Sequence, residues 1–463
     1  MNKAIRSKLF LMMVLEFFIW GAWLPLIFGY LPSLGFSATK PPAGLDFFPP
    51  SISWIFSEQS LILNAFPIAA VVGMFFSNQF ADRNFAAEKF LAASHLIGGL
   101  AILALGFVKD FWPFFGLMLV HCLLYVPTIS ITNSIAFANM KDAQKEFGIV
   151  RMGGTIGWIL AAWPFTFILV DWAKVSATPT TGFVDWLGAV LGNGLTGTAL
   201  QNATPWTFKV AGIASLLLSG FSLMLPHTPP KPVEKEAQNH LAWLEAMKLL
   251  AIPFILILWL VTFVDATVHN LFFNWTGRFL GTAPAQGGVG IPGNWIMPVM
   301  SIGQIAEILT MLILGATLKK LGWRTTMIIG ILGHAARFAV FAFFPQHKEI
   351  VVLVNVLHGI CYAFFFATVY IFVDEFFPKD ARASAQGLFN LMILGFGPLV
   401  ANIVGPVLIG NTFFDPKSGI VDFQSLFLVP CVAAIFAALA LFAFFRPPIR
   451  SAAKVEGTPV AAH

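Results

Sequence analysis

Long apolar stretches separated by short polar or Pro- and Gly-rich breaks run through the whole chain. Most stretches reach about twenty residues, the length a helix needs to cross roughly 30 Å of hydrocarbon. They are continuous, whereas the strands of a membrane barrel alternate apolar and polar residues in segments of about ten. The pattern therefore predicts an all-α membrane protein with twelve transmembrane helices. The predicted spans are residues 9–30, 58–80, 88–107, 112–137, 150–171, 207–226, 251–274, 296–318, 325–345, 350–374, 384–409 and 425–446.

Composition supports a lipid environment for most of the chain. Hydrophobic residues make up 58% and charged residues 11% of the 463 positions, against about 25% charged residues in soluble domains. The net charge of +5 comes from single basic residues at span edges, so we expect no nucleic-acid partner. The sequence has no metal-ligand cluster, nucleophile motif or phosphate loop, which disfavours a membrane enzyme or sensor and predicts no cofactor and no metal.

The basic residues also predict the orientation. With the N-terminus inside, nineteen of the 27 Lys and Arg residues fall on the cytoplasmic side and seven outside, while Arg337 lies within a span. This bias follows the positive-inside rule and places both termini in the cytoplasm. The Pro-rich, charged segment 227–250 is the predicted linker between two pseudo-symmetric six-helix bundles, residues 1–226 and 251–446, and 447–463 is a predicted disordered tail. Such paired bundles place a transport site between them, near the middle of the membrane.

Polar side chains within the spans are the candidate site, because an ionisable group there costs at least about 2.5 kcal/mol. In the fifth span, Arg151, Thr155 and Trp158 are spaced at i, i+4 and i+7 on one helix face. Either these three side chains line a polar cavity, or Arg151 is an arginine at the membrane interface beside a Trp158 that is packed in the core. In the seventh span, Thr267 and Asn270 share a stripe with hydrogen-bond donors and acceptors suited to a neutral solute. The alternative is contact between helices.

The eighth span places Gln304 and Glu307 on one side of a helix, with Glu307 deep in apolar sequence. A carboxylate at that depth can exchange a proton as its surroundings change between wet and dry. The alternative is a permanent ion pair with Arg337. In the tenth span, His358 and Tyr362 lie at i and i+4, and aromatic faces there can stack on flat rings or pack in the core.

Several motifs resemble those of the bacterial nucleoside:proton symporters of the major facilitator superfamily, along nearly the whole chain. They are FIWGAWL (18–24), YVPT (125–128), RMGGTIGW (151–158), SIGQIAE (301–307), RFAVFA (337–342), ARASAQGLF (381–389) and GIVDFQS (419–425). The resemblance implies the major facilitator fold and nucleoside uptake driven by a proton gradient. It implies substrate contacts from Arg151, Thr155, Gln304, Glu307 and Asn270, which match the family pattern outright.

Other positions depart from the family pattern. Trp158 and Tyr362 stand where the family has phenylalanine, Thr267 where it has glutamine, and His358 where it has tyrosine. Ala363 occupies the place of a family aspartate that is associated with substrate binding and proton coupling. Coupling then falls to Glu307 alone, or Glu16, which stands where the family has glutamine, substitutes for the missing acid. The remaining alternatives are a changed substrate or an uncoupled carrier.

The resulting hypothesis is a monomeric, proton-coupled importer of nucleosides or a related ribosyl or sugar-like solute in the cell inner membrane. Its partners are the solute, protons and the lipid bilayer. The alternative is a facilitator or antiporter for another small polar metabolite such as a sugar.

Overall fold

The computed structural model describes residues 3–45, 47–73, 85–140, 143–230, 247–377 and 382–447, and this part of the chain is almost entirely helical. Eight helical segments are long and apolar enough to cross a membrane, and a ninth crossing results if a pair bent by 80° counts as one span. The eight segments are Lys3–Ser33, Ala87–Leu105, Phe111–Ala138, Pro253–Gly281, Gly293–Phe343, Lys348–Phe376, Ala385–Thr412 and Phe423–Phe444.

The first half of the chain contributes five long helices. These are α1 (Lys3–Ser33), α6 (Ala87–Leu105), α7 (Phe111–Ala138), α8 (Ala143–Ala162) and α13 (Trp206–Ser222). The bent pair joins the helical segment Ser51–Leu63, which ends in α3 (Glu58–Leu63), to α4 (Ala65–Val72), and the two meet at Asn64. Shorter helices are α2 (Pro50–Ser53), η1 (Trp54–Phe56), α9 (Phe165–Ile168), α10 (Trp172–Ala177), α11 (Phe183–Gly192) and α12 (Gly197–Ala203).

The second half is built mainly on α15 (Pro253–Gly281), α16 (Ile296–Phe343) and α22 (Phe423–Phe444). Two further crossings are segmented: α17 (Lys348–Leu353), α18 (Val356–Cys361), η7 (Tyr362–Ala367) and α19 (Thr368–Phe376), then α20 (Arg382–Asn390), η8 (Leu391–Phe396), α21 (Gly397–Val407) and η9 (Leu408–Thr412). The remaining elements are η4 (Leu249–Ala251), η5 (Pro284–Gln286), η6 (Gly293–Trp295) and the short antiparallel strands β1 (Phe414–Asp415) and β2 (Ile420–Val421).

The 48-residue α16 is two helices that meet at Gly322, whose φ of 72° is a conformation that a residue with a side chain rarely adopts. The predicted spans 296–318 and 325–345 lie on either side of this break. The predicted spans 150–171 and 207–226 correspond mainly to α8 and α13, which are outside the group of eight apolar helices.

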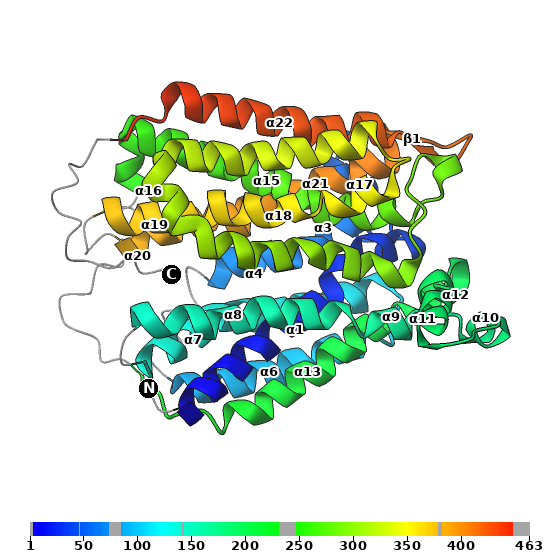
Figure 1. The fold of residues 1–463 in the computed structure, drawn as a ribbon, viewed down its shortest axis with the longest axis horizontal. Coiled ribbons are helices and arrows are strands. Elements are labelled where there is room, and N and C mark those ends of the chain that lie inside the picture. The colour runs from blue at the N-terminus through cyan, green and yellow to red at the C-terminus, as the bar shows by residue number, and fades with distance from the viewer. Residues whose placement is uncertain are drawn as a thin grey trace.

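The helices form two packed groups. One large cluster of buried apolar side chains draws on residues 9–225 together with Met297, and a second draws on residues 255–445. Figure 1 shows α15, α16 and α22 on one side of the molecule and α1, α6, α8 and α13 on the other. Much of the predicted linker (231–246) and of the predicted tail (from 448) lies outside the described residues.

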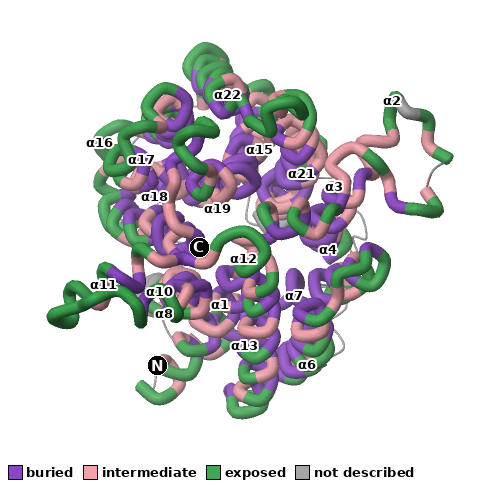
Figure 2. The backbone as a smooth tube through the Cα atoms, turned by 90° about the vertical axis from the view of Figure 1, so that its right-hand side faces the viewer, coloured by how far each residue is buried: buried purple, intermediate pink, exposed green. Residues whose placement is uncertain are grey.

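The outward faces of the helices are apolar. Leu309 is 62% exposed and Phe436 is 67% exposed, although both lie in long apolar helices. Figure 2 shows buried segments inside the helix assembly and exposed ones around it. Lipid tails suit such a surface, since they solvate apolar side chains and cannot bond a bare backbone.

Most of the short helices gather at one end of the molecule. Figure 1 shows α10, α11, α12 and β1 at the end opposite the start of α1. We call this the loop end; it carries the segments 31–57, 172–206 and 276–295. There Asn402 donates to the Leu63 carbonyl at 2.9 Å, and Asn294 donates to the carbonyls of Thr166 and Val190 at 3.2 and 3.1 Å. Side-chain amides of the second half are therefore bonded to the backbone of the first half at the loop end.

Candidate functional site

The glycines of the RMGGTIGW motif let α8 pack directly on α1. A Cβ at Gly153 would lie 2.6 Å from the Phe10 carbonyl oxygen, and one at Gly157 only 2.0 Å from that of Val14. Only glycine allows so close an approach of two backbones. Arg151, Thr155 and Trp158 share another face of α8, and all three are half-buried. At the edge of the contact with α1, the Arg151 guanidinium lies 4.3 Å from the centre of the Phe17 ring.

A second close contact fixes Glu307 in the other half. A Cβ at Gly359 of α18 would lie 2.2 Å from the backbone nitrogen of Glu307, so α16 and α18 touch backbone to backbone. Ile305 and Leu309, on the opposite face of α16, are 43% and 62% exposed toward the apolar surface. The half-buried Glu307 therefore faces the protein interior rather than lipid.

Arg151 and Trp158 of the first half reach the helices of the second half. The charge of Arg151 acts on Glu307 and on the hydroxyl groups of Tyr362 and Tyr370. The Trp158 ring lies edge-on to Phe273 of α15, with centroids 6.2 Å apart. It also lies edge-on to Trp20 of α1 at 5.3 Å. A cation, a carboxylate and aromatic rings from both halves thus come together at one interface.

Amide and hydroxyl groups at this interface keep unused hydrogen-bonding capacity. Thr267 and Asn270 are half-buried on α15 and bond carbonyls of their own helix at 2.9 and 2.8 Å. The Gln304 side-chain oxygen is buried and has no partner within the described part of the chain. The same holds for the Trp20 indole nitrogen. A buried polar group without a partner costs about 1–3 kcal/mol, which a bound polar solute would offset.

His358 lies differently from the other predicted residues. It is 2% exposed, and its Nδ1 accepts a hydrogen bond from Arg337 at 2.8 Å, whereas Tyr362 is half-buried. Arg337 also donates to His334 at 3.0 Å. The alternative in which Glu307 pairs with Arg337 is thus not realised in the structure, because both terminal nitrogens of Arg337 bond histidines.

Glu16 belongs to a hydrogen-bonded network inside the first half. Its Oε2 lies 2.9 Å from His95 Nε2, and its Oε1 accepts from the Thr128 hydroxyl at 2.8 Å. His95 Nδ1 in turn lies 2.9 Å from the Ser215 hydroxyl. Glu16 is fully buried, and both of its carboxylate oxygens have partners.

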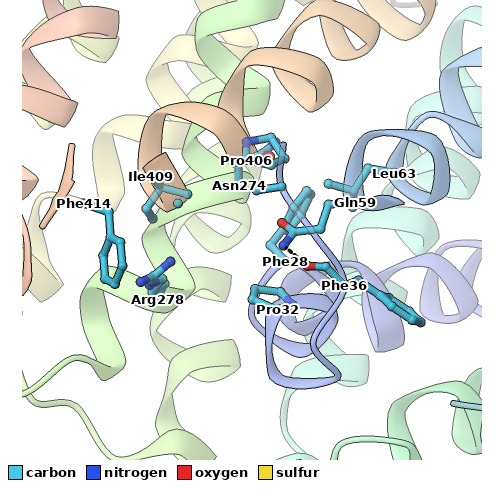
Figure 3. Close-up of a pocket in the computed structure, with 12 residues that line it drawn as sticks. Phe28, Pro32, Phe36, Gln59, Leu63, Asn274, Arg278, Pro406, Ile409 and Phe414 are labelled. Carbon is cyan, nitrogen blue, oxygen red and sulfur yellow. Dashed lines mark hydrogen bonds between the residues drawn. The ribbon is translucent and has the colours of Figure 1, made fainter. Parts of the chain in front are cut away.

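A cavity of about 240 Å³ opens at the loop end, between α1, α3, α15 and α21. Figure 3 shows Arg278 beside Phe414 on one side of it and Gln59 on the other, where Gln59 donates to the Phe36 carbonyl at 2.6 Å. None of the nine predicted substrate residues lines this cavity, which is a separate space at the loop end.

Comparison with known protein families gives a match along nearly the whole chain. The family model described as nucleoside H+ symporter matches residues 1–192 and 178–450. The chain belongs to the nucleoside H+ symporter family. It is therefore a multi-pass membrane transporter and not an enzyme, as the sequence motifs indicated.

Curated members of the nucleoside H+ symporter family are similar over almost their full length. The putative nucleoside transporter YegT of Escherichia coli is 29% identical over 449 residues, covering 95% of this chain and 93% of the relative. The nucleoside permease NupG of Escherichia coli is 27% identical over 456 residues, covering 96% of each chain. The xanthosine permease of the same organism is 25% identical, also covering 96% of each.

Solved structures show the same fold. The crystal structure of nucleoside transporter NupG matches with a TM-score of 0.74 at 23% identity, covering 97% of this chain and 100% of that one. The D-xylose-proton symporter matches with a TM-score of 0.65 at 15% identity, covering 96% and 98%. These likenesses establish the major facilitator fold.

Sequence reasoning on this symporter missed one residue of a buried group. His334 was not among the candidates, although it lies 3.7 Å from Asp265 and bonds Arg337. Its spacing of three residues before Arg337 on one helix was the available signal.

Proposed function

We propose that this symporter carries nucleosides into the cytoplasm together with protons, through a site between its two halves. The observation that carries the proposal is the approach of Arg151 and Trp158 from the first half to Glu307 and Phe273 of the second. Ionisable residues inside spans mark substrate and proton paths. The similarity to a nucleoside permease (NupG), a putative nucleoside transporter (YegT) and a xanthosine permease supports a nucleoside as the solute.

The proposed topology has twelve crossings of the inner membrane, with both termini in the cytoplasm. The protein is proposed to be a monomer. This topology adds α8, α13 and the bent α3–α4 pair to the apolar helices and counts α16 as two crossings at Gly322. The halves are residues 1–226 and 251–446. The excess of Lys and Arg at the end where α1 starts supports this orientation. The loop end then faces the outside of the cell. The hydrogen bonds that the Asn294 and Asn402 side chains donate to the first half close the site on that side.

The substrate-binding residues are proposed from both chemistry and place. The nucleoside base stacks on Trp158 or Tyr362, since aromatic faces favour flat rings. Gln304, Asn270, Thr155 and Thr267 supply hydrogen bonds to base and ribose. Because Gln304 Oε1 has no protein partner among the described residues, it is the acceptor most in need of a ligand hydrogen. His358 lies behind the residues proposed to contact the substrate, and it contributes to the site through the hydrogen bond that it accepts from Arg337.

Proton coupling is proposed at Glu307. When ionised, the Glu307 carboxylate is attracted by the charge of Arg151 across the interface; when protonated, it loses this attraction. A change in protonation thereby alters how strongly the halves attract each other, as alternating access requires. Glu16 is the other coupling acid predicted from the sequence; because His95 and Thr128 occupy both of its oxygens, we propose a structural role for it instead.

Uptake of labelled uridine and adenosine into proteoliposomes tests the proposal. We expect accumulation when the outside is acidic relative to the lumen, and equilibration without a gradient. A lack of nucleoside uptake under both conditions would remove the nucleoside assignment. Uptake that equilibrates but never accumulates would instead indicate a facilitator.

A further inference from the structure

The second half encloses a group of buried ionisable side chains that the proposed substrate site does not explain. Asp265 lies on α15, His334 and Arg337 on α16, and His358 on α18, and each is at most 2% exposed. We call these four residues the buried cluster. Ionisable groups inside membrane spans are costly and are kept for pairing or for function.

Hydrogen bonds to Arg337 fix where the two histidines carry their protons. Arg337 Nη1 donates to Nδ1 of His358 at 2.8 Å, and Nη2 donates to Nδ1 of His334 at 3.0 Å. Because a guanidinium only donates, both rings accept at Nδ1 and, when neutral, hold their proton on Nε2. His334 Nε2 lies 3.7 Å from Asp265 Oδ2. The His334 ring thus stands between the Arg337 cation and the Asp265 carboxyl group.

The contact between His334 and Asp265 is incomplete. A distance of 3.7 Å is beyond hydrogen-bond range, and within the described residues neither Asp265 oxygen nor His334 Nε2 has a hydrogen-bond partner. An ionised carboxylate without partners is strongly disfavoured in an apolar interior, so a proton on Asp265 relieves this arrangement. A closer approach by less than about 1 Å would complete the bond and stabilise the ionised form. Small helix movements therefore change which form of Asp265 is favoured.

His269 connects the buried cluster to the side of Glu307. Its ring stacks on His358 at 4.8 Å, lies edge-on to His334 at 5.5 Å and is 6.4 Å from Tyr362. Tyr362 in turn experiences the charge of Glu307. His269 is half-buried, and its Nδ1 has no hydrogen-bond partner among the described residues.

Two thiols complete the titratable groups around the buried cluster. Cys361 of α18 interacts electrostatically with Arg337 and Asp265. From α22, Cys431 donates to the Ala335 carbonyl at 3.4 Å, next to His334 in sequence. The charges of Cys361 and Asp265 both act on Arg337. Asp265 is the carboxylic acid of the buried cluster, and its protonation changes the net charge of the cluster by one.

We propose that Asp265, positioned against His334, is a second proton-binding site of the transporter, in addition to Glu307. In each cycle a hydronium ion on the acidic side transfers one proton to the Asp265 carboxylate, and the same proton later leaves Asp265 for a water molecule on the other side. Two protons then enter with each nucleoside. The inference rests on the proposed proton-coupled uptake.

Accumulation at equilibrium measures the number of protons directly. With a pH gradient of one unit and the membrane voltage held at zero, each coupled proton contributes about a tenfold accumulation ratio. We expect about 100-fold accumulation of uridine by the wild type and about tenfold by Asp265→Asn. Exchange of labelled for unlabelled uridine needs no net proton movement and should persist in the variant. Asp110→Asn, an exposed aspartate at the start of α7, is the matched control and should behave as wild type.

The proposal can be tested even if the Asp265→Asn variant fails to fold. Asp265→Asn leaves Arg337 without its counter-charge, so we pair it with the double variant Asp265→Asn/Arg337→Gln, which removes both charges. At least one should elute as a folded protein and exchange uridine with about tenfold accumulation. About 100-fold accumulation by an exchanging variant would overturn the second site and leave the proposed function intact. The second site is also overturned if neither variant exchanges uridine while the wild type does, because Asp265 would then be needed for the carrier itself. No accumulation by the wild type would overturn both.

Discussion

Replacing Gly359 by alanine is expected to disturb the contact that holds Glu307 in place. The added Cβ would lie 2.2 Å from the Glu307 nitrogen and 2.5 Å from the Ala306 carbonyl carbon, whereas ordinary contacts begin at 3.4 Å. The two backbones must therefore separate by about 1.2 Å, because neither neighbour is a flexible side-chain end. Overpacking of this kind costs about 1–3 kcal/mol, and a 1 Å displacement of a binding group can lower activity about 100-fold.

Gly315→Ala is the matched control on α16, since a Cβ there meets nothing within 4 Å. Thermal unfolding in detergent and initial rates of uridine uptake measure the two effects. We expect Gly359→Ala to lower both the melting temperature and the uptake rate, while Gly315→Ala retains both. Equal behaviour of the two variants would refute the backbone contact between α16 and α18 as the element that positions Glu307.

Three other substitutions test separate parts of the mechanism. Glu307→Gln should lower gradient-driven accumulation at least tenfold while exchange persists, because glutamine cannot release a proton; wild-type accumulation would contradict the coupling role. Trp158→Ala should raise the KM for uridine about 2- to 12-fold, from the loss of about 0.5–1.5 kcal/mol of ring contact, and Trp158→Phe should restore most of it. Asn402→Ala removes the bond to the Leu63 carbonyl, worth about 0.5–1.5 kcal/mol. The Asn402→Ala substitution should increase chemical labelling of an engineered cysteine placed between the loop end and the substrate site. Unchanged labelling would exclude this hydrogen bond as one of those that close the site at the loop end.

The apolar pattern located the helices but not how they bend. The predicted loop between spans 296–318 and 325–345 contains Gly322, where α16 breaks. The 80° bend at Asn64 is not visible in the apolar pattern, because both sides of it are apolar. Its signal in the sequence is Pro67, which has no N–H to bond the Leu63 carbonyl four residues earlier. That carbonyl accepts instead from Asn402 of the second half.

Site residues were predictable where one helix face decides their direction. Arg151, Thr155 and Trp158 share a face of the regular helix α8, and all are half-buried. His358 and Tyr362 were paired by the same spacing rule, yet only Tyr362 is half-buried. The partners of His358 are far away in sequence, so spacing could not reveal them.

Comparison of the two buried acid–histidine pairs separates structural from functional burial. Glu16 and His95 in the first half lie 2.9 Å apart, and Thr128 satisfies the other oxygen. Asp265 and His334 in the second half lie 3.7 Å apart, with both carboxylate oxygens unpartnered among the described residues. A completed network has one favourable arrangement, whereas an incomplete one can gain or lose a proton as helices shift.

Glu16→Gln should therefore act on stability rather than on coupling. Its amide group turns one acceptor into a donor and leaves a buried partner unsatisfied, at a cost of about 1–3 kcal/mol. We expect a lower melting temperature with an unchanged accumulation ratio, whereas Asp265→Asn should lower the accumulation ratio about tenfold. A reduced ratio with unchanged melting would instead make Glu16 the substitute for the acid absent at Ala363, because only a proton-carrying group alters the equilibrium ratio without altering the fold.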